Sequence, residues 1–171
     1  MKKAAIVLGF ILFVVFLFLT LAKKPHPKVI ATGNTAQRPI DFFPNAYQCS
    51  ECKMPIASKT YAAEVVALDG KTWFFDDVGC MGAWIAGQPF KKEATVWVHT
   101  LDTQRWVDGR KARYSVFENT PMGYGFGAYE KRVEGTVDFA TMVSKMARGE
   151  NLANRDYAKK LLEEKARRGS R

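Results

Sequence analysis

The sequence predicts an α+β fold of two small strand-strand-helix units with largely antiparallel sheet, the first unit closed by an extra strand, all preceded by one N-terminal transmembrane helix. Two observations predict the folded part: short β-rich segments alternate with turn signals, and a helical pattern follows each pair of segments. An apolar run at the amino terminus predicts the membrane helix. The chain then divides into an anchor (1–24), a linker (25–44), a folded domain (45–150) and a charged carboxyl-terminal tail or helix (151–171).

The apolar run covers Ala4 to Ala22, 19 consecutive residues without a charge. About 20 apolar residues cross a hydrocarbon core about 30 Å thick. The run is longer than the apolar region of a cleaved signal peptide, and it ends in a poor cleavage signal, which favours a retained anchor over a cleaved leader. A short head before one apolar segment is typical of a signal-anchor. We therefore expect a single-pass protein of a bacterial cytoplasmic membrane, with its soluble domain on the periplasmic side.

The strands of the first unit are predicted from β-rich segments. Residues 61–68 and 71–75 flank Asp69-Gly70, a hairpin signal, and residues 94–99 alternate as a third strand. The second unit repeats the order with strands at 112–117 and 124–129 around a turn at NTPMG. Both pairs predict antiparallel sheet.

Each pair of strands precedes a predicted helix. Asp76 or Asp77 can cap the first helix, and Gly87 ends it. The second helix is expected over residues 137–148, where Met142 and Met146 are spaced as core residues of one face. These helices should pack against the sheet.

The net charge of +9 is concentrated outside the folded domain. Part of it lies in LAKKPHPK, beside the apolar run, and part in the last 18 residues, NRDYAKKLLEEKARRGSR. The latter segment suits a solvated helix or a frayed end, with attraction to acidic lipid headgroups as the alternative. We expect no nucleic-acid partner. The linker 25–44 has proline and polar residues without apolar periodicity, as in a spacer.

The stretch CSECKM places Cys49, Cys52 and Met54 within six residues. A haem attachment would need histidine after the second cysteine, where Lys53 stands. Structural zinc usually takes two spaced ligand pairs, and a plain disulfide at this spacing is strained. A redox dithiol normally begins a helix, whereas the nearest predicted element here is a strand. The methionine favours a soft ion, and Cu(I) is the biological one.

Other residues could join such a site. Met122 lies between Pro121 and Gly123 in a loop with little core to fill, although it could also fill a gap under that loop. Cys80 falls in the first turn of the predicted helix, where it could be a thiolate ligand or a small buried hydrophobe. His99 ends a strand, where a solvated or capped side chain is more common than a ligand.

The order of these motifs resembles the NosL family, copper-binding accessory proteins for nitrous oxide reductase assembly. The resemblance covers roughly residues 45–147 and rests on CSECKM, the Asp-Gly hairpin, WFFDDVGCMGAWI, VWVHTLDTQRWVDGRKARYSV and TPMGYGFGAYE, in that order. It implies two small units of strands and helix. Many relatives are tethered through a terminal cysteine, whereas this chain has only the apolar run.

The resemblance also implies a function and a ligand set. It implies a chaperone that holds Cu(I) outside the cytoplasmic membrane and delivers it to a periplasmic copper enzyme or a membrane transporter complex, in particular toward nitrous oxide reductase. The implied metal ligands are Cys52, Met54 and Met122, with Cys49 as a further candidate and Cys80 as a reserve ligand or second site.

Two other functions stay open. The first is a membrane-tethered thiol-disulfide oxidoreductase that uses Cys49 and Cys52, and the second is a docking module without metal. Asp102, Asp108 and Glu118 have no histidine or nucleophile at a catalytic spacing, so we do not expect an enzyme.

Overall fold

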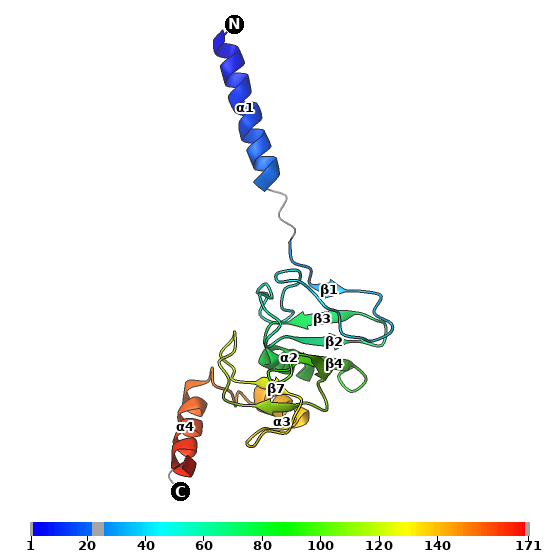
Figure 1. The fold of residues 1–171 in the computed structure, drawn as a ribbon, viewed down its shortest axis with the longest axis vertical. Helices are drawn as coiled ribbons and strands as arrows, with labels where there is room; N and C mark the ends of the chain where they lie inside the picture. Colours follow the sequence, from blue (N-terminus) through cyan, green and yellow to red (C-terminus); the bar gives the residue numbers. More distant parts are fainter. Residues whose placement is uncertain (1, 22–25, 170–171) are drawn as a thin grey trace.

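The computed structural model describes residues 2–21 and 26–169 as an α+β fold (Figure 1). One sheet has five antiparallel strands in the order β1-β3-β2-β4-β5, and a second sheet pairs β6 with β7. The strands are β1 (Ile30–Ala31), β2 (Ala63–Val66), β3 (Thr72–Phe75), β4 (Thr95–His99), β5 (Trp106–Asp108), β6 (Arg113–Ser115) and β7 (Gly127–Tyr129). The helices are α1 (Lys2–Leu21), α2 (Val78–Ala86), α3 (Phe139–Ala147) and α4 (Arg155–Gly169).

The central hairpin of the large sheet forms where the sequence predicts it. β2 pairs with β3 so that Ala63 faces Phe75 and Val66 faces Thr72, and a turn at Asp69 and Gly70 joins them. Gly70 has a φ of 79°, and a Cβ atom there would meet backbone atoms at 2.9 Å. Only glycine fits that approach.

The main core lies between the large sheet and the helices α2 and α3. Strand side chains alternate, so one face of the sheet carries Val65, Phe75, Val96 and Val98 into this core. We call it the inner face. Gly82 of α2 lets the two helices approach, because a Cβ atom there would lie 2.9 Å from the sulfur of Met142. The helices therefore cover the inner face as a pair.

Residues 28–47 cover the opposite, outer face of the sheet, and we call this segment the strap. The Trp97 indole N–H donates to the carbonyl oxygen of Gln37 at 2.9 Å, and Asn34 donates to the Thr72 hydroxyl at 3.1 Å. A small apolar cluster under the strap contains Phe42, Ile56, Ala62 and Phe74. Most of the expected linker, residues 25–44, thus packs against the sheet.

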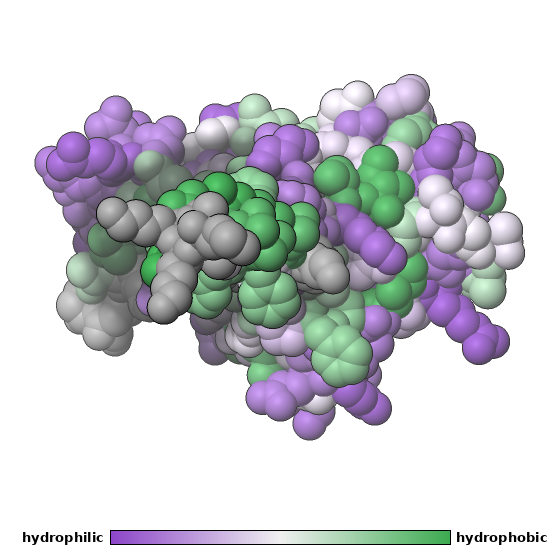
Figure 2. Space-filling view, turned by 90° about the horizontal axis from the view of Figure 1, so that it is seen from above, coloured by the Kyte–Doolittle hydropathy of each residue, from purple (hydrophilic) through white to green (hydrophobic). Residues whose placement is uncertain are grey.

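The membrane part of the fold prediction is wrong. Among the residues that the structure describes, no helix is long and apolar enough to cross a membrane. The predicted location as a single-pass membrane protein is wrong for the same reason. Hydrophobic and hydrophilic residues lie side by side on the face seen from above (Figure 2).

Candidate metal centre

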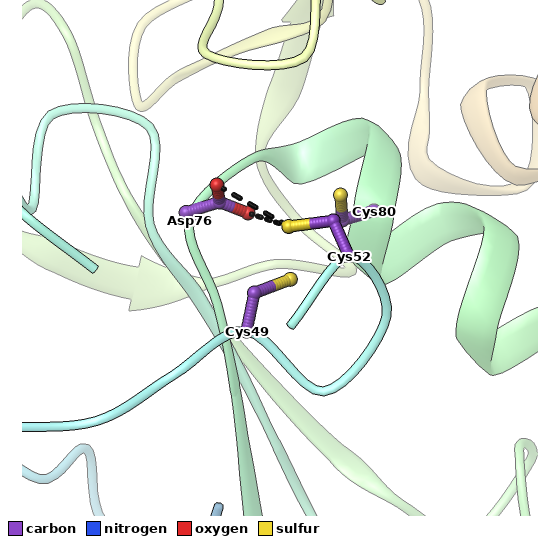
Figure 3. Close-up of side chains that lie close together, drawn as sticks. All are labelled: Cys49, Cys52, Asp76 and Cys80. Atoms are coloured by element: carbon purple, nitrogen blue, oxygen red, sulfur yellow. Dashed lines mark hydrogen bonds between the residues drawn. The ribbon is translucent and has the colours of Figure 1, made fainter. Parts of the chain in front are cut away.

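Three thiols and one carboxylate converge at one end of the inner face (Figure 3). The sulfur atoms of Cys49, Cys52 and Cys80 and a carboxylate oxygen of Asp76 all lie within 4.8 Å of one another. Two sulfur ligands about 2.3 Å from one ion are at most about 4.6 Å apart. The four side chains therefore need only small shifts to share a metal ion.

The loop that carries Cys49 and Cys52 is a tight backbone turn. The Cys49 N–H donates to the Met54 carbonyl oxygen at 2.8 Å, and the Lys53 N–H donates to the Cys49 carbonyl oxygen at 3.1 Å. Lys53 takes a left-handed φ of 67°, which reverses the chain directly after the second cysteine. Ser50 N–H donates to the Phe74 carbonyl oxygen at 2.8 Å, so the turn is fixed to β3.

The other two residues come from the junction between β3 and α2. Only Asp76 and Asp77 separate the end of β3 from the start of α2, so the junction turns sharply. Asp77 caps the helix by accepting from the Gly79 N–H at 2.7 Å. The cap fixes the first turn, and Cys80 lies in that turn with its side chain fully buried. Asp76 and Cys80 therefore meet across the helix start.

The three thiols of the centre differ in pKa, that is, in how readily each loses its proton. A hydrogen bond from the Cys80 thiol, with smaller help from the Asp76 and Cys52 backbone N–H groups, lowers the pKa of Cys49 to about 7. The same hydrogen bond raises the pKa of Cys80. Burial raises the pKa of Cys52 to about 12. Cys49 is the thiol most ready to bind as a thiolate, and the two others must lose protons when an ion arrives.

Cys52 connects the buried thiols to the surface. It is half-buried, whereas Cys49 and Cys80 are fully buried. Its thiol donates to Asp76 at 3.4 Å from one carboxylate oxygen and 3.5 Å from the other (Figure 3). An ion can enter or leave past this pair.

The two candidate methionines lie at the border of the centre. Met54 is 42% exposed and lines a pocket of about 270 Å³ with Asp76 and Pro121. Met122 follows Pro121, is half-buried and packs against the main core. His99, in contrast, lies at the end of β4, with its ring against Trp106 at 5.4 Å between centroids. The structure thus groups the predicted cysteines, places Met54 in one pocket wall with Asp76, and leaves His99 elsewhere.

Asp76 is the member that sequence analysis did not assign to the site. The sequence offered it only as a helix cap, and Asp77 takes that role instead. Two adjacent acids before a cysteine-bearing helix leave one carboxylate without a capping function, and this was the available signal.

The donor set could hold a metal ion, and its composition admits more than one. Three thiolates with a carboxylate fit tetrahedral zinc, whereas thiolates with thioethers fit Cu(I). No model of a known protein family matches this chain, and no curated protein matches it. The resemblance to the NosL family therefore stays a prediction, and the interpretation of function rests on the geometry of the centre.

Proposed function

We propose that the centre holds Cu(I) and that the protein is a metallochaperone. The convergence of Cys49, Cys52 and Cys80 within 4.8 Å is the observation that carries the proposal. Cu(I) is satisfied by two or three sulfur ligands and does not need the carboxylate. Asp76 then is not a ligand.

The arrangement suits transfer as well as storage. Two buried thiols hold the ion, and Cys52 with the exposed Met54 forms an outer pair that an acceptor can reach. Thiolates bind Cu(I) tightly, while a thioether has no proton to regain and exchanges readily. An acceptor can therefore replace the outer ligands one at a time. The acceptor we propose is a copper enzyme, and nitrous oxide reductase is the one that the NosL resemblance implies.

The geometry gives less support to a thiol-disulfide oxidoreductase. Such an enzyme attacks with an accessible thiolate of low pKa. Here the thiol of lowered pKa is Cys49, which is fully buried, and burial raises the pKa of the more accessible Cys52. The accessible thiol is therefore the poor nucleophile.

Separate loading with Cu(I) under anaerobic conditions and with Zn(II) tests the proposal. Affinities are measured by competition with chelators for the parent protein, for Asp76→Asn, and for Met54→Leu combined with Met122→Leu. If the centre binds Cu(I), we expect the double methionine variant to lose about tenfold or more in Cu(I) affinity. Asp76→Asn should then stay near the parental value. Met146→Leu, on α3, serves as the control for loss of a thioether elsewhere.

A zinc site gives the opposite result. Asp76→Asn would then weaken Zn(II) binding by about 10- to 100-fold, and the methionine variant would bind as the parent does. That outcome, or a parent protein that retains neither metal, would overturn the copper assignment.

A further inference from the structure

Residues 120–125 form a loop that lies over the start of α2, and we call it the lid loop. The side chain of Tyr124 packs directly on Gly79, because a Cβ atom added there would lie 2.5 to 2.8 Å from atoms of Tyr124. Gly79 immediately precedes Cys80. Burial, and next the nearby Cys80, raise the pKa of Tyr124. The tyrosine therefore covers the helix turn that carries a buried thiol.

Asp77 ties the lid loop to α2. One carboxylate oxygen accepts from the Gly79 N–H at 2.7 Å and caps the helix, while the other accepts from the Met122 N–H at 3.0 Å. The Thr120 side chain also hydrogen-bonds to Asp77. The carboxylate is fully buried, so these bonds face no competition from solvent. One side chain thus fixes Met122 relative to the helix of Cys80.

Glycines flank Tyr124 in the lid loop, and only Gly123 has room to turn, because a Cβ atom on Gly125 would lie 2.7 Å from the side chain of Leu152. Gly123 and Gly125 have φ values of 69° and 89°, on either side of Tyr124. A Cβ atom on Gly123 would meet nothing within 4 Å, so this residue has open space around it. Beyond Asp77, two backbone hydrogen bonds hold the loop to the remaining structure. The Leu152 N–H donates to the Tyr124 carbonyl oxygen at 3.1 Å, and the Glu118 N–H donates to the Gly125 carbonyl oxygen at 2.9 Å.

We propose that the lid loop closes the metal centre and that Asp77 is its latch, a positioning residue that keeps Met122 and Tyr124 over the Cys80 turn. This inference rests on the proposed metal-binding function. With the latch formed, Met122 stays at the border of the centre and the bound ion is shielded on that side. When the latch opens, the loop turns about Gly123, and an acceptor reaches the ion.

Asp77→Asn separates the latch from the helix cap. Asparagine caps a helix about as well as aspartate, so α2 should keep its start. The amide, however, has one acceptor oxygen and an NH₂ group, which cannot accept from the Met122 N–H. We expect Cu(I) to pass from the loaded full-length protein to a chelator about tenfold faster than from the parent. In a Met122→Leu background, Asp77→Asn should add much less, because the positioned thioether is already gone.

Asp138→Asn is the matched control. Asp138 caps α3 by accepting from the Thr141 N–H at 2.8 Å, and within the described part of the chain it has no hydrogen bond to the lid loop. Asp138→Asn should therefore release Cu(I) at the parental rate. Gly79→Ala tests the lid from the other side, since the added Cβ must displace Tyr124. It should speed release as Asp77→Asn does.

Amide hydrogen exchange on the metal-free protein distinguishes a failure of the latch from a failure of the proposed metal-binding function. Opening of the lid loop should speed amide exchange at Met122 and Leu152 in Asp77→Asn but not in Asp138→Asn. Parental exchange at both amides would refute the latch, whatever the protein binds. If exchange rises but neither lid variant alters release, the loop does not close the centre. If exchange rises and the parent binds no Cu(I), the proposed function fails and with it the role of the lid.

Discussion

The two faces of the five-stranded sheet bury polar groups of different kinds. On the inner face the polar groups contact one another, as the buried Cys49 does with Cys80 and the half-buried Cys52 with Asp76. On the outer face Glu64 is equally buried but isolated. One of its oxygens accepts from the Ile40 N–H at 3.0 Å, and the other has no hydrogen-bond partner among the described residues.

This difference separates chemistry from stability. The inner groups can release protons to solvent when a metal ion binds, and the bound ion then compensates for their burial. The Glu64 carboxyl gains no such ion, and its environment favours the neutral form. Packing of the strap on the sheet therefore buries a carboxyl group whose ionisation is unfavourable. Substitutions on the inner face should therefore change metal affinity, and substitutions on the outer face should change the free energy of unfolding.

The largest expected effect is the pH dependence of stability caused by Glu64. Burial raises the pKa of Glu64 from 4.5 to about 8. The folded state keeps a proton that the unfolded state releases, so stability falls as pH rises between these values. At about 1.36 kcal/mol per pH unit, the whole loss is up to about 4 to 5 kcal/mol. Glu64→Gln should abolish this decline, as measured by urea unfolding at pH 5 and pH 8.5.

A matched substitution tests whether the decline belongs to this buried group. Glu134 is exposed in the loop before α3, so Glu134→Gln should keep the parental decline. If Glu64→Gln also keeps it, Glu64 does not cause the pH dependence and the contrast between the faces is lost.

The next effect concerns metal affinity on the inner face. Cys80 is the third residue of α2 and Thr141 the third residue of α3, and an aspartate caps each helix. Cys80→Ser should weaken metal binding by about 100-fold or more, since it removes a ligand from the centre. Thr141→Ser at the equivalent position should leave affinity unchanged. Chelator competition measures both, and parental affinity in Cys80→Ser would remove it from the centre.

Sequence periodicity predicted the inner face well. The hairpin of β2 and β3, the helix capped at Asp77 and the helix α3 all lie within the predicted segments. Each has a strong local signal in a turn, a cap or an apolar face. The strands β1 and β5 were not predicted, because β1 lies in the segment expected as a linker and β5, with the sequence WVD, shows no alternation of apolar and polar residues.

The strap on the outer face and the complete metal centre both depend on contacts between segments that are distant in the sequence. The strap is polar and rich in turns, so its composition resembles a linker, yet its bonds reach residues such as Thr72 and Trp97. The spacing of Cys49 and Cys52 marked the site. Their meeting with Asp76 depends on the bond from Ser50 to Phe74, which joins segments 24 residues apart. No local pattern encodes that pairing.

The smallest effect is expected where the strap is tied to the outer face. Trp97→Phe keeps an aromatic ring but removes the N–H that donates to the Gln37 carbonyl oxygen, which should cost about 1 kcal/mol. Amide hydrogen exchange should then become faster at Gln37 and Arg38, whose N–H groups bond to Asn34 in the same turn of the strap. Metal affinity should stay parental because the inner face is untouched. Trp106→Phe is the control, since its indole N–H has no partner among the described residues and its loss breaks no bond. Equal amide exchange at Gln37 and Arg38 in the two variants would mean that packing alone holds the strap, and a weakened metal centre in Trp97→Phe would show that the two faces are coupled.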